Sequence, residues 1–167
     1  MLPTIMSRPP RLASANYVGI KQHFLTICTD GRLRVFHDPT VVDMVVMQIL
    51  RAAGQHAFEI SAYCFMPDHV HALVAGQRED SDLCRFVALA KQRSGFTFGK
   101  SVRRRLWQEG YFDRILRSDE PTFSVIRYIV ENPLRAGIVS QVDDYPFWGS
   151  AVYTRQEMID SLISGRP

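Results

Sequence analysis

The stretch that decides the fold is EISAYCFMPDHVHALVA, at residues 59–75. Aromatic and β-branched residues are frequent in both halves, and a Pro-Asp pair interrupts them as a turn. The pattern predicts two strands, at residues 59–66 and 69–75, that pair as an antiparallel hairpin. Side chains two residues apart on a strand project from the same face, about 6 to 7 Å apart. His69 and His71 are therefore expected to share one face of the sheet.

The elements around the hairpin are predicted from spacing, composition and capping residues. They are a strand at 22–29, a helix from Asp38-Pro39 to Gly54, a helix at 82–100, a strand at 112–116, and a helix from 118 or 119 to Asn132. The order strand, helix, strand, strand, helix, strand is typical of the α+β split β-α-β, or ferredoxin-like, arrangement. In that fold helices cover one face of an antiparallel sheet, and we expect the other face to be free for a site.

The length of 167 residues suits one compact domain, and 46% hydrophobic with 22% charged residues excludes a disordered or low-complexity chain. We expect an N-terminal arm at 1–16, the domain at 17–140, and a C-terminal tail at 141–167 that packs on it. No apolar run approaches the roughly 18 to 20 residues of a membrane span. The first residues also lack the apolar core of a secretory signal, so we expect a cytoplasmic protein without a membrane partner.

Charge is unevenly distributed along the chain. The net charge is only +3, yet residues 85–117 carry nine basic residues against two acidic ones, and 17 of the 20 basic residues are Arg. Guanidinium groups suit phosphate oxygens, so this segment is a candidate nucleic-acid interface, although a solvated face is the plainer reading. The candidate phosphate contacts are Lys91, Arg93, Lys100, Arg103, Arg104, Arg105, Arg114 and Arg117. Trp107, Tyr111 and Phe112 are either base-stacking or buried core aromatics.

Two sets of residues carry possible chemistry. His69 and His71 can share one metal ion, or they can be surface or hydrogen-bonded histidines. Tyr128 and Asn132 are four residues apart and so share one helix face, where a phenol and an amide can reach the same point. Without the histidines, the alternative interpretation is that Tyr128 is an amphipathic residue at the edge of the core and that Asn132 is a polar residue that ends the helix.

Three ordered motifs make the pattern recognisable. They are MPDHVH in a strand, then WQEGYFDR, then RYIVENPLRAGIV. Together they resemble the single-tyrosine HUH transposases, and within these the REP-associated tyrosine transposases, over residues 22–153. The resemblance implies the HUH endonuclease fold and a metal-dependent endonuclease and strand transferase that acts on single-stranded DNA.

The resemblance also implies a role for individual residues. His69 and His71 match the metal ligands, Tyr128 the nucleophile, and Asn132 the polar residue that completes the metal site. The ion would be Mg²⁺ or Mn²⁺, and attack by Tyr128 would give a covalent 5′-phosphotyrosine without ATP. The partners implied are REP-like single-stranded DNA hairpins with a short flanking guide sequence, read in part by Arg8 and Arg11. A monomer is favoured, and a homodimer is the alternative.

Two other functions are compatible with the residues. A non-catalytic ferredoxin-like module could bind single-stranded nucleic acid through its sheet and Arg-rich segments. A metal hydrolase could use water as nucleophile and leave Tyr128 a structural role. A tyrosine-dependent covalent adduct on DNA separates the transposase from both.

Overall fold

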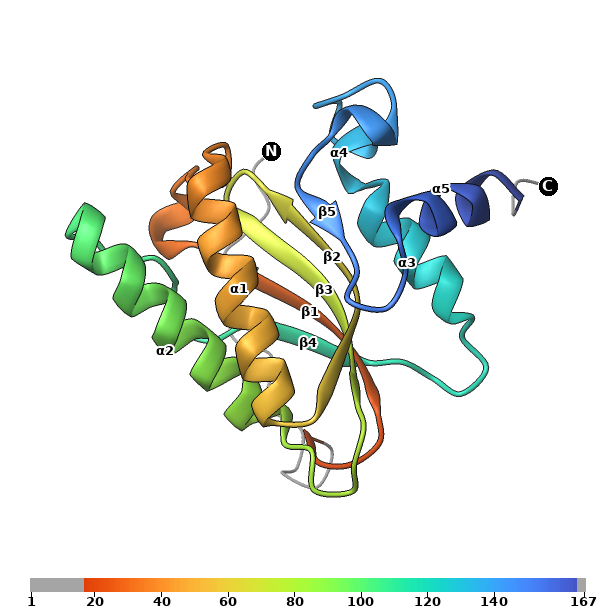
Figure 1. The fold of residues 1–167 in the computed structure, drawn as a ribbon, viewed down its shortest axis with the longest axis horizontal. Helices are drawn as coiled ribbons and strands as arrows, with labels where there is room; N and C mark the ends of the chain where they lie inside the picture. The colour runs from red at the N-terminus through yellow and green to blue at the C-terminus, as the bar shows by residue number, and fades with distance from the viewer. Residues whose placement is uncertain (1–16, 165–167) are drawn as a thin grey trace, which may run out of the picture.

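The computed structural model describes residues 17–164, and Arg8, Arg11 and the rest of the predicted arm lie outside this range. Five strands form one sheet in the order β4-β1-β3-β2-β5, and every neighbouring pair is antiparallel (Figure 1). They are β1 (Gln22–Cys28), β2 (Phe58–Met66), β3 (His69–Gly76), β4 (Phe112–Ile115) and β5 (Trp148–Gly149). The α+β class and the split β-α-β arrangement are confirmed, and β5 is an addition at the β2 edge.

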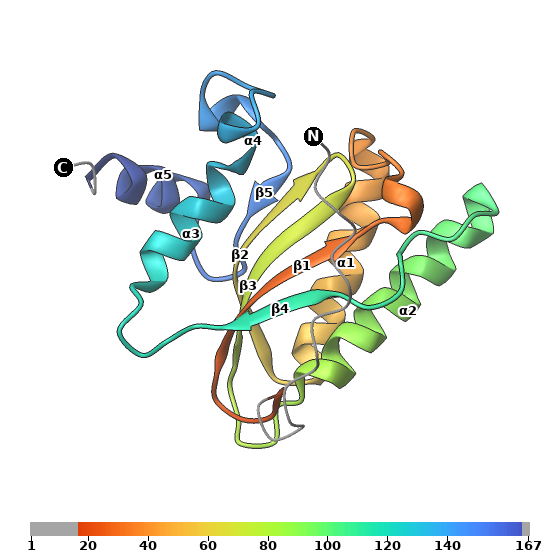
Figure 2. The same ribbon diagram turned by 180° about the vertical axis from the view of Figure 1, so that it is seen from behind.

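One face of the sheet is covered by α1 (Pro39–Gln55) and α2 (Leu83–Val102), which lie side by side (Figure 2). The Asp38 side chain accepts a hydrogen bond from the Thr40 amide, and proline occupies the first turn, as the sequence predicts. Alternate side chains of β1 and β3, among them Leu25, Ile27 and Val70, are buried beneath these two helices in the larger core. That layer fixes which side of each strand faces away from α1 and α2.

The opposite face is only partly free, which corrects the expectation of a bare surface. The helix α3 (Thr122–Val130) packs across β2 and β3 on the other side of the sheet from α1 (Figure 1). Val125, Ile126, Ile129 and Val130 of α3 join a second core that contains Leu73 of β3. The helix is amphipathic and apolar enough to need this cover. The β1–β4 side of the face is left for a site.

The helix α3 begins later than the spacing indicates. It starts at Thr122, after Pro121, because a residue that precedes proline disfavours helical backbone geometry. The sequence predicts that Pro133 ends the helical path, but it does not. A short helix, α4 (Asn132–Arg135), continues it, because proline is tolerated in a first helical turn. Glu131 between the two helices keeps φ −81° and ψ 0°.

The last described segment also packs against the second core. It contains η3 (Val142–Asp144), β5 and α5 (Arg155–Ser164). Elsewhere in the chain, the short helix η2 (Asp30–Arg32) follows β1. Tyr145, Trp148 and Met158 are buried, and the Tyr145 hydroxyl donates a 2.6 Å hydrogen bond to the Phe65 carbonyl of β2. Within residues 17–164, every helix is too short or too polar to cross a membrane.

Candidate active site

His69 and His71 lie on the face of β3 that points away from α1 and α2. The register places Thr26 of β1 opposite His71, and the Thr26 hydroxyl is 2.9 Å from His71 Nδ1. Burial and the neighbouring His69 lower the pKa of His71 to about 3, so this imidazole stays neutral at physiological pH. A neutral imidazole is the form that ligates metals.

His69 is held by the residue before it in the sequence. Asp68 Oδ1 lies 2.6 Å from His69 Nδ1, and Arg32 Nε lies 3.2 Å from the second carboxylate oxygen. A carboxylate can only accept here, so Nδ1 of His69 carries a hydrogen, and in the neutral imidazole Nε2 carries the lone pair. A carboxylate behind a histidine is the partner that orients metal ligands and increases their basicity. The sequence pattern marks Asp68 only as part of the turn, whereas the structure directs its side chain at His69.

The two imidazoles converge on one point. His69 Nε2 and His71 Nε2 are 3.1 Å apart. When His71 carries its hydrogen on Nε2, that nitrogen donates to His69 Nε2 and the Thr26 hydroxyl donates to His71 Nδ1. When His71 instead places its hydrogen on Nδ1 toward Thr26, both Nε2 lone pairs point to the same place. The Thr26 hydroxyl serves either tautomer, because it is both donor and acceptor.

The two converging imidazoles are suitable ligands for a divalent ion. In the described part of the chain no three His, Cys, Asp or Glu side chains cluster for a metal, so any third protein ligand beside the two histidines would be a different kind of group. Asn132 begins α4, and its buried side-chain nitrogen has no hydrogen-bond partner among residues 17–164. An amide that rotates by half a turn presents oxygen in place of nitrogen. Two imidazoles and one amide are ligands that Mn²⁺ accepts and Mg²⁺ tolerates.

Tyr128 lies beside the histidines of its own chain. Phe24 of β1 stacks on His71 with ring centroids 5.4 Å apart, and Tyr128 meets Phe24 edge-on at 5.9 Å. The Tyr128 ring centroid is 6.5 Å from that of His71, and Tyr128 is half exposed to solvent. This aromatic cluster therefore brings the phenol of α3 and the imidazoles of β3 to one place on the sheet.

Arg135 places a positive charge over the phenol. Its guanidinium lies 4.2 Å from the centre of the Tyr128 ring, donates to the Tyr128 carbonyl oxygen, and pairs with Glu131 at 3.7 Å. A guanidinium over an aromatic face is a favourable cation–π arrangement. Arg135 was not among the predicted site residues, although it is part of the third motif, one helical turn beyond Glu131.

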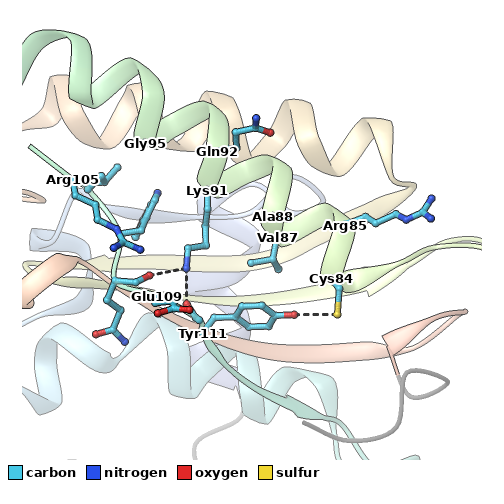
Figure 3. A pocket seen from close by; sticks show the side chains of 14 residues that line it. Cys84, Arg85, Val87, Ala88, Lys91, Gln92, Gly95, Arg105, Glu109 and Tyr111 are labelled. Carbon is cyan, nitrogen blue, oxygen red and sulfur yellow. Dashed lines mark hydrogen bonds between the residues drawn. The ribbon is translucent and has the colours of Figure 1, made fainter. Parts of the chain in front are cut away.

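Lys91 lies in a pocket of about 680 Å³ between α2 and the segment before β4 (Figure 3). Its amine donates to the carbonyls of Gln108 and Gly110 at 2.9 and 2.5 Å, so it ties this segment to α2. Burial and the charge of Arg105 lower its pKa to about 8. These contacts give Lys91 a structural role. Two of the hydrogen-bond donors of its amine are already engaged, so fewer remain for the phosphate contact that the sequence predicts.

The other predicted phosphate contacts fall in two places. Arg114 is on β4 and lies close to Tyr128 around one cavity, with Arg117 in the turn before α3. The remaining ones lie on α2 or directly after it, and α2 is on the opposite side of the sheet from α3, which carries Tyr128 (Figure 1). They are the half-buried Arg93 and the exposed Lys100, Arg103, Arg104 and Arg105. The structure therefore does not gather all basic residues around the tyrosine.

The three aromatic candidates have different environments. Trp107 is buried in the larger core and its indole nitrogen donates to Ser94 at 2.9 Å, so the core reading holds for it. Tyr111 is half-buried, with its hydroxyl 3.5 Å from Cys84 Sγ (Figure 3). Phe112 is 43% exposed on β4, opposite Thr26. Only Phe112 presents a broad apolar surface next to the site.

Comparison with known proteins gives a consistent set of relatives. The family model described as "Transposase IS200 like" matches residues 16–132. A REP-associated tyrosine transposase of Escherichia coli K12 is 28% identical over 109 residues, which are 65% of this chain and 64% of that protein. A relative from Haemophilus influenzae is 26% identical over 103 residues, covering 55% and 58%. The chain thus matches less than two thirds of the length of these relatives.

A solved structure shares the fold. It is a REP-associated tyrosine transposase bound to a REP hairpin, with a TM-score of 0.71 and 24% identity. The match covers 86% of this chain and 82% of the other. At this identity the likeness concerns the arrangement of helices and strands.

Proposed function

This chain belongs to the IS200-like transposase family, and from that premise we propose that it cleaves and rejoins single-stranded DNA beside hairpins, with Tyr128 as nucleophile. The observation that carries the proposal is the meeting of Tyr128 with the His69–His71 pair within one chain. A single-stranded binding module would not need a phenol and two converging imidazoles in one place. The matched family argues in the same direction.

The residues divide the chemistry between them. His69, His71 and Asn132 would hold a divalent ion, which when bound neutralises charge on the nonbridging phosphate oxygens. Tyr128 attacks phosphorus, forms the O–P bond and displaces the 3′-oxygen. The phenol loses its proton and the 3′-oxygen gains one in the net step. The resulting 5′-phosphotyrosine conserves the bond energy, so a 3′-hydroxyl can reverse the reaction without ATP.

Arg135 and Phe24 act on the tyrosine. The guanidinium of Arg135 favours negative charge as it develops on the phenol, because a cation over the ring is attracted to it. Phe24 packs against both Tyr128 and His71, so it positions the nucleophile relative to the metal ligands. Misplacement of such groups by about 1 Å can cost about a hundredfold in rate.

The proposed substrate is a single strand that contains a REP-like hairpin and a short flanking guide sequence. A relative of this fold has been solved with a REP hairpin, which supports a hairpin partner here. Because one chain supplies phenol and imidazoles together, we propose that a monomer suffices. Action on chromosomal palindromes would place the protein at the nucleoid.

The experiment uses a pool of end-labelled single-stranded oligonucleotides, each with a stable hairpin flanked by randomised sequence, and Mn²⁺ or Mg²⁺. The wild-type protein is expected to form a covalent adduct that survives denaturing electrophoresis, and sequencing of the trapped strands reads the guide. Tyr128→Phe should abolish the adduct and keep hairpin binding, because only the attacking oxygen is removed. Tyr153→Phe, a partly exposed tyrosine outside the cluster, is the matched control.

The possible outcomes separate the three functions. Cleavage without an adduct would support a water nucleophile and overturn the role of Tyr128. Binding without cleavage, at either metal, would favour the non-catalytic module. An adduct that persists in Tyr128→Phe would assign the nucleophile elsewhere.

A further inference from the structure

A second cavity, of about 390 Å³, lies between α3 and the β1–β4 side of the sheet. Arg114 and Phe112 pair with Phe24 and Thr26 of β1, so both project from the face that carries His71. The residues around the cavity that matter here are Phe24, Phe112, Arg114, Glu120, Ser124 and Tyr128. Since Tyr128 borders both this cavity and the histidines, whatever fills the cavity lies next to the nucleophile.

The cavity has an aromatic wall. Phe112 and Tyr128 remain 43% and 50% exposed, whereas Phe24, on β1, is buried. An exposed phenylalanine on the free side of an edge strand is costly to leave in water. Unpaired bases stack on such rings, with a contribution of about 1 to 3 kcal/mol per base, and every base has a suitable face.

The cavity also has a guanidinium at its rim that already holds an anion. Arg114 Nη1 and Nη2 lie 2.6 and 2.9 Å from the two carboxylate oxygens of Glu120. The same fork fits two oxygens of a phosphate equally well. Arg114 lowers the pKa of Glu120, so the carboxylate is charged at neutral pH and occupies the place that a phosphate would take.

On the premise of the function proposed above, we propose that this cavity binds one unpaired nucleotide of the strand, next to the cleaved bond. Its base lies on the ring of Phe112, and its phosphate replaces Glu120 on Arg114. Glu120 thereby keeps Arg114 oriented in the free protein and lowers its affinity for strands that do not fill the cavity. The contact resembles an exposed ion pair, which is weak enough to exchange.

The test measures binding in a Tyr128→Phe background, with a fluorescein-labelled pool of single-stranded oligonucleotides of random sequence and fluorescence anisotropy as readout. Glu120→Gln should lower the Kd about two- to fivefold, because it removes a competing anion of exposed ion-pair strength. Phe112→Ala should raise the Kd about fivefold or more, through lost stacking.

Two matched variants control for general effects. Asp80→Asn removes the same charge from another two-oxygen ion pair, with Arg78, that borders no part of the cavity. Phe123→Ala removes a phenylalanine of α3 that is 50% exposed and packs on Tyr153. An effect of Glu120→Gln no larger than that of Asp80→Asn, or of Phe112→Ala no larger than that of Phe123→Ala, overturns the subsite.

The binding measurement tests the subsite independently of the cleavage experiment. A wild-type adduct together with unresponsive binding in these variants would leave the proposed function intact and reject the subsite. Responsive binding without any adduct would keep a nucleotide subsite and reject Tyr128 as nucleophile. Thermal unfolding of each variant shows that a loss of binding is not a loss of fold.

Discussion

Replacement of Asp68 by Ala should weaken metal binding without removing any proposed ligand. The substitution deletes the 2.6 Å contact to His69 Nδ1 and frees Arg32. A charge-assisted hydrogen bond is worth about 1.5 to 3 kcal/mol. The side chains of Asp68 and His69 are 24% and 16% exposed, so solvent screens part of this interaction and the lower half of the range applies.

That energy corresponds to a rise of about ten- to fortyfold in the Kd for Mn²⁺. Removal of a partner behind a ligating histidine costs about 10- to 100-fold in affinity, which agrees with the value worked from the contact. Isothermal titration of the protein with Mn²⁺ alone measures it, and Asp68→Asn should give a smaller loss because an amide oxygen still accepts from Nδ1.

The control is Asp43→Ala, which removes an exposed carboxylate from α1 on the other side of the sheet. Cleavage by Asp68→Ala should return when Mn²⁺ is raised in proportion to the new Kd. A Kd within twofold of that of the wild type would refute the idea that Asp68 orients a metal ligand. A loss of cleavage that excess Mn²⁺ does not restore would refute it as well.

Three other perturbations test different parts of the molecule. Burial lowers the pKa of His23 to about 4, so the folded protein resists a proton that the unfolded chain binds below about 6.5, and stability falls as pH decreases through this window. Urea unfolding at pH 7 and pH 5 should show about 2 kcal/mol more loss in the wild type than in His23→Gln, and equal losses would contradict the assignment. Replacing the arginines at 103–105 with alanine should weaken binding to single-stranded DNA and reduce its salt dependence, by about 0.7 in log–log slope per lost phosphate contact, and an unaltered slope excludes such contacts. Tyr145→Phe should cost about 1 to 2 kcal/mol of unfolding free energy, because it leaves the buried Phe65 carbonyl without its donor, whereas no change would show that water replaces it.

The sequence was sufficient for features that depend on near neighbours. The turn at Pro67-Asp68 and the alternation around it define the β2–β3 hairpin, and with it the shared face of His69 and His71. The Asp38 cap and the following proline define where α1 begins. These signals come from residues close together in the sequence, and the tertiary contacts of the fold agree with them.

Features that depend on distant partners could not be read in this way. Lys91 looks like any basic residue of an amphipathic helix until the segment before β4 brings two carbonyls to its amine. Trp107 is held in the core by a hydrogen bond from its indole nitrogen to Ser94, 13 residues earlier in the chain. Thr26 becomes relevant only through the β1–β3 register, which sets it opposite His71. For the tyrosine site, spacing indicated which residues share a face, and packing decides their distances.

The burial of one whole side of α3 also limits how two copies could cooperate. Val125, Ile126, Ile129 and Val130 are fixed between the sheet and the C-terminal segment, and Arg127 donates to the Leu162 carbonyl of α5. Moving this helix away from its own sheet would expose all four apolar side chains, at a cost of several kcal/mol, unless the second molecule supplied its own α3 in exchange. Without such an exchange, an equimolar mixture of Tyr128→Phe and His71→Ala proteins is expected to stay inactive, since neither can donate its intact half to the other.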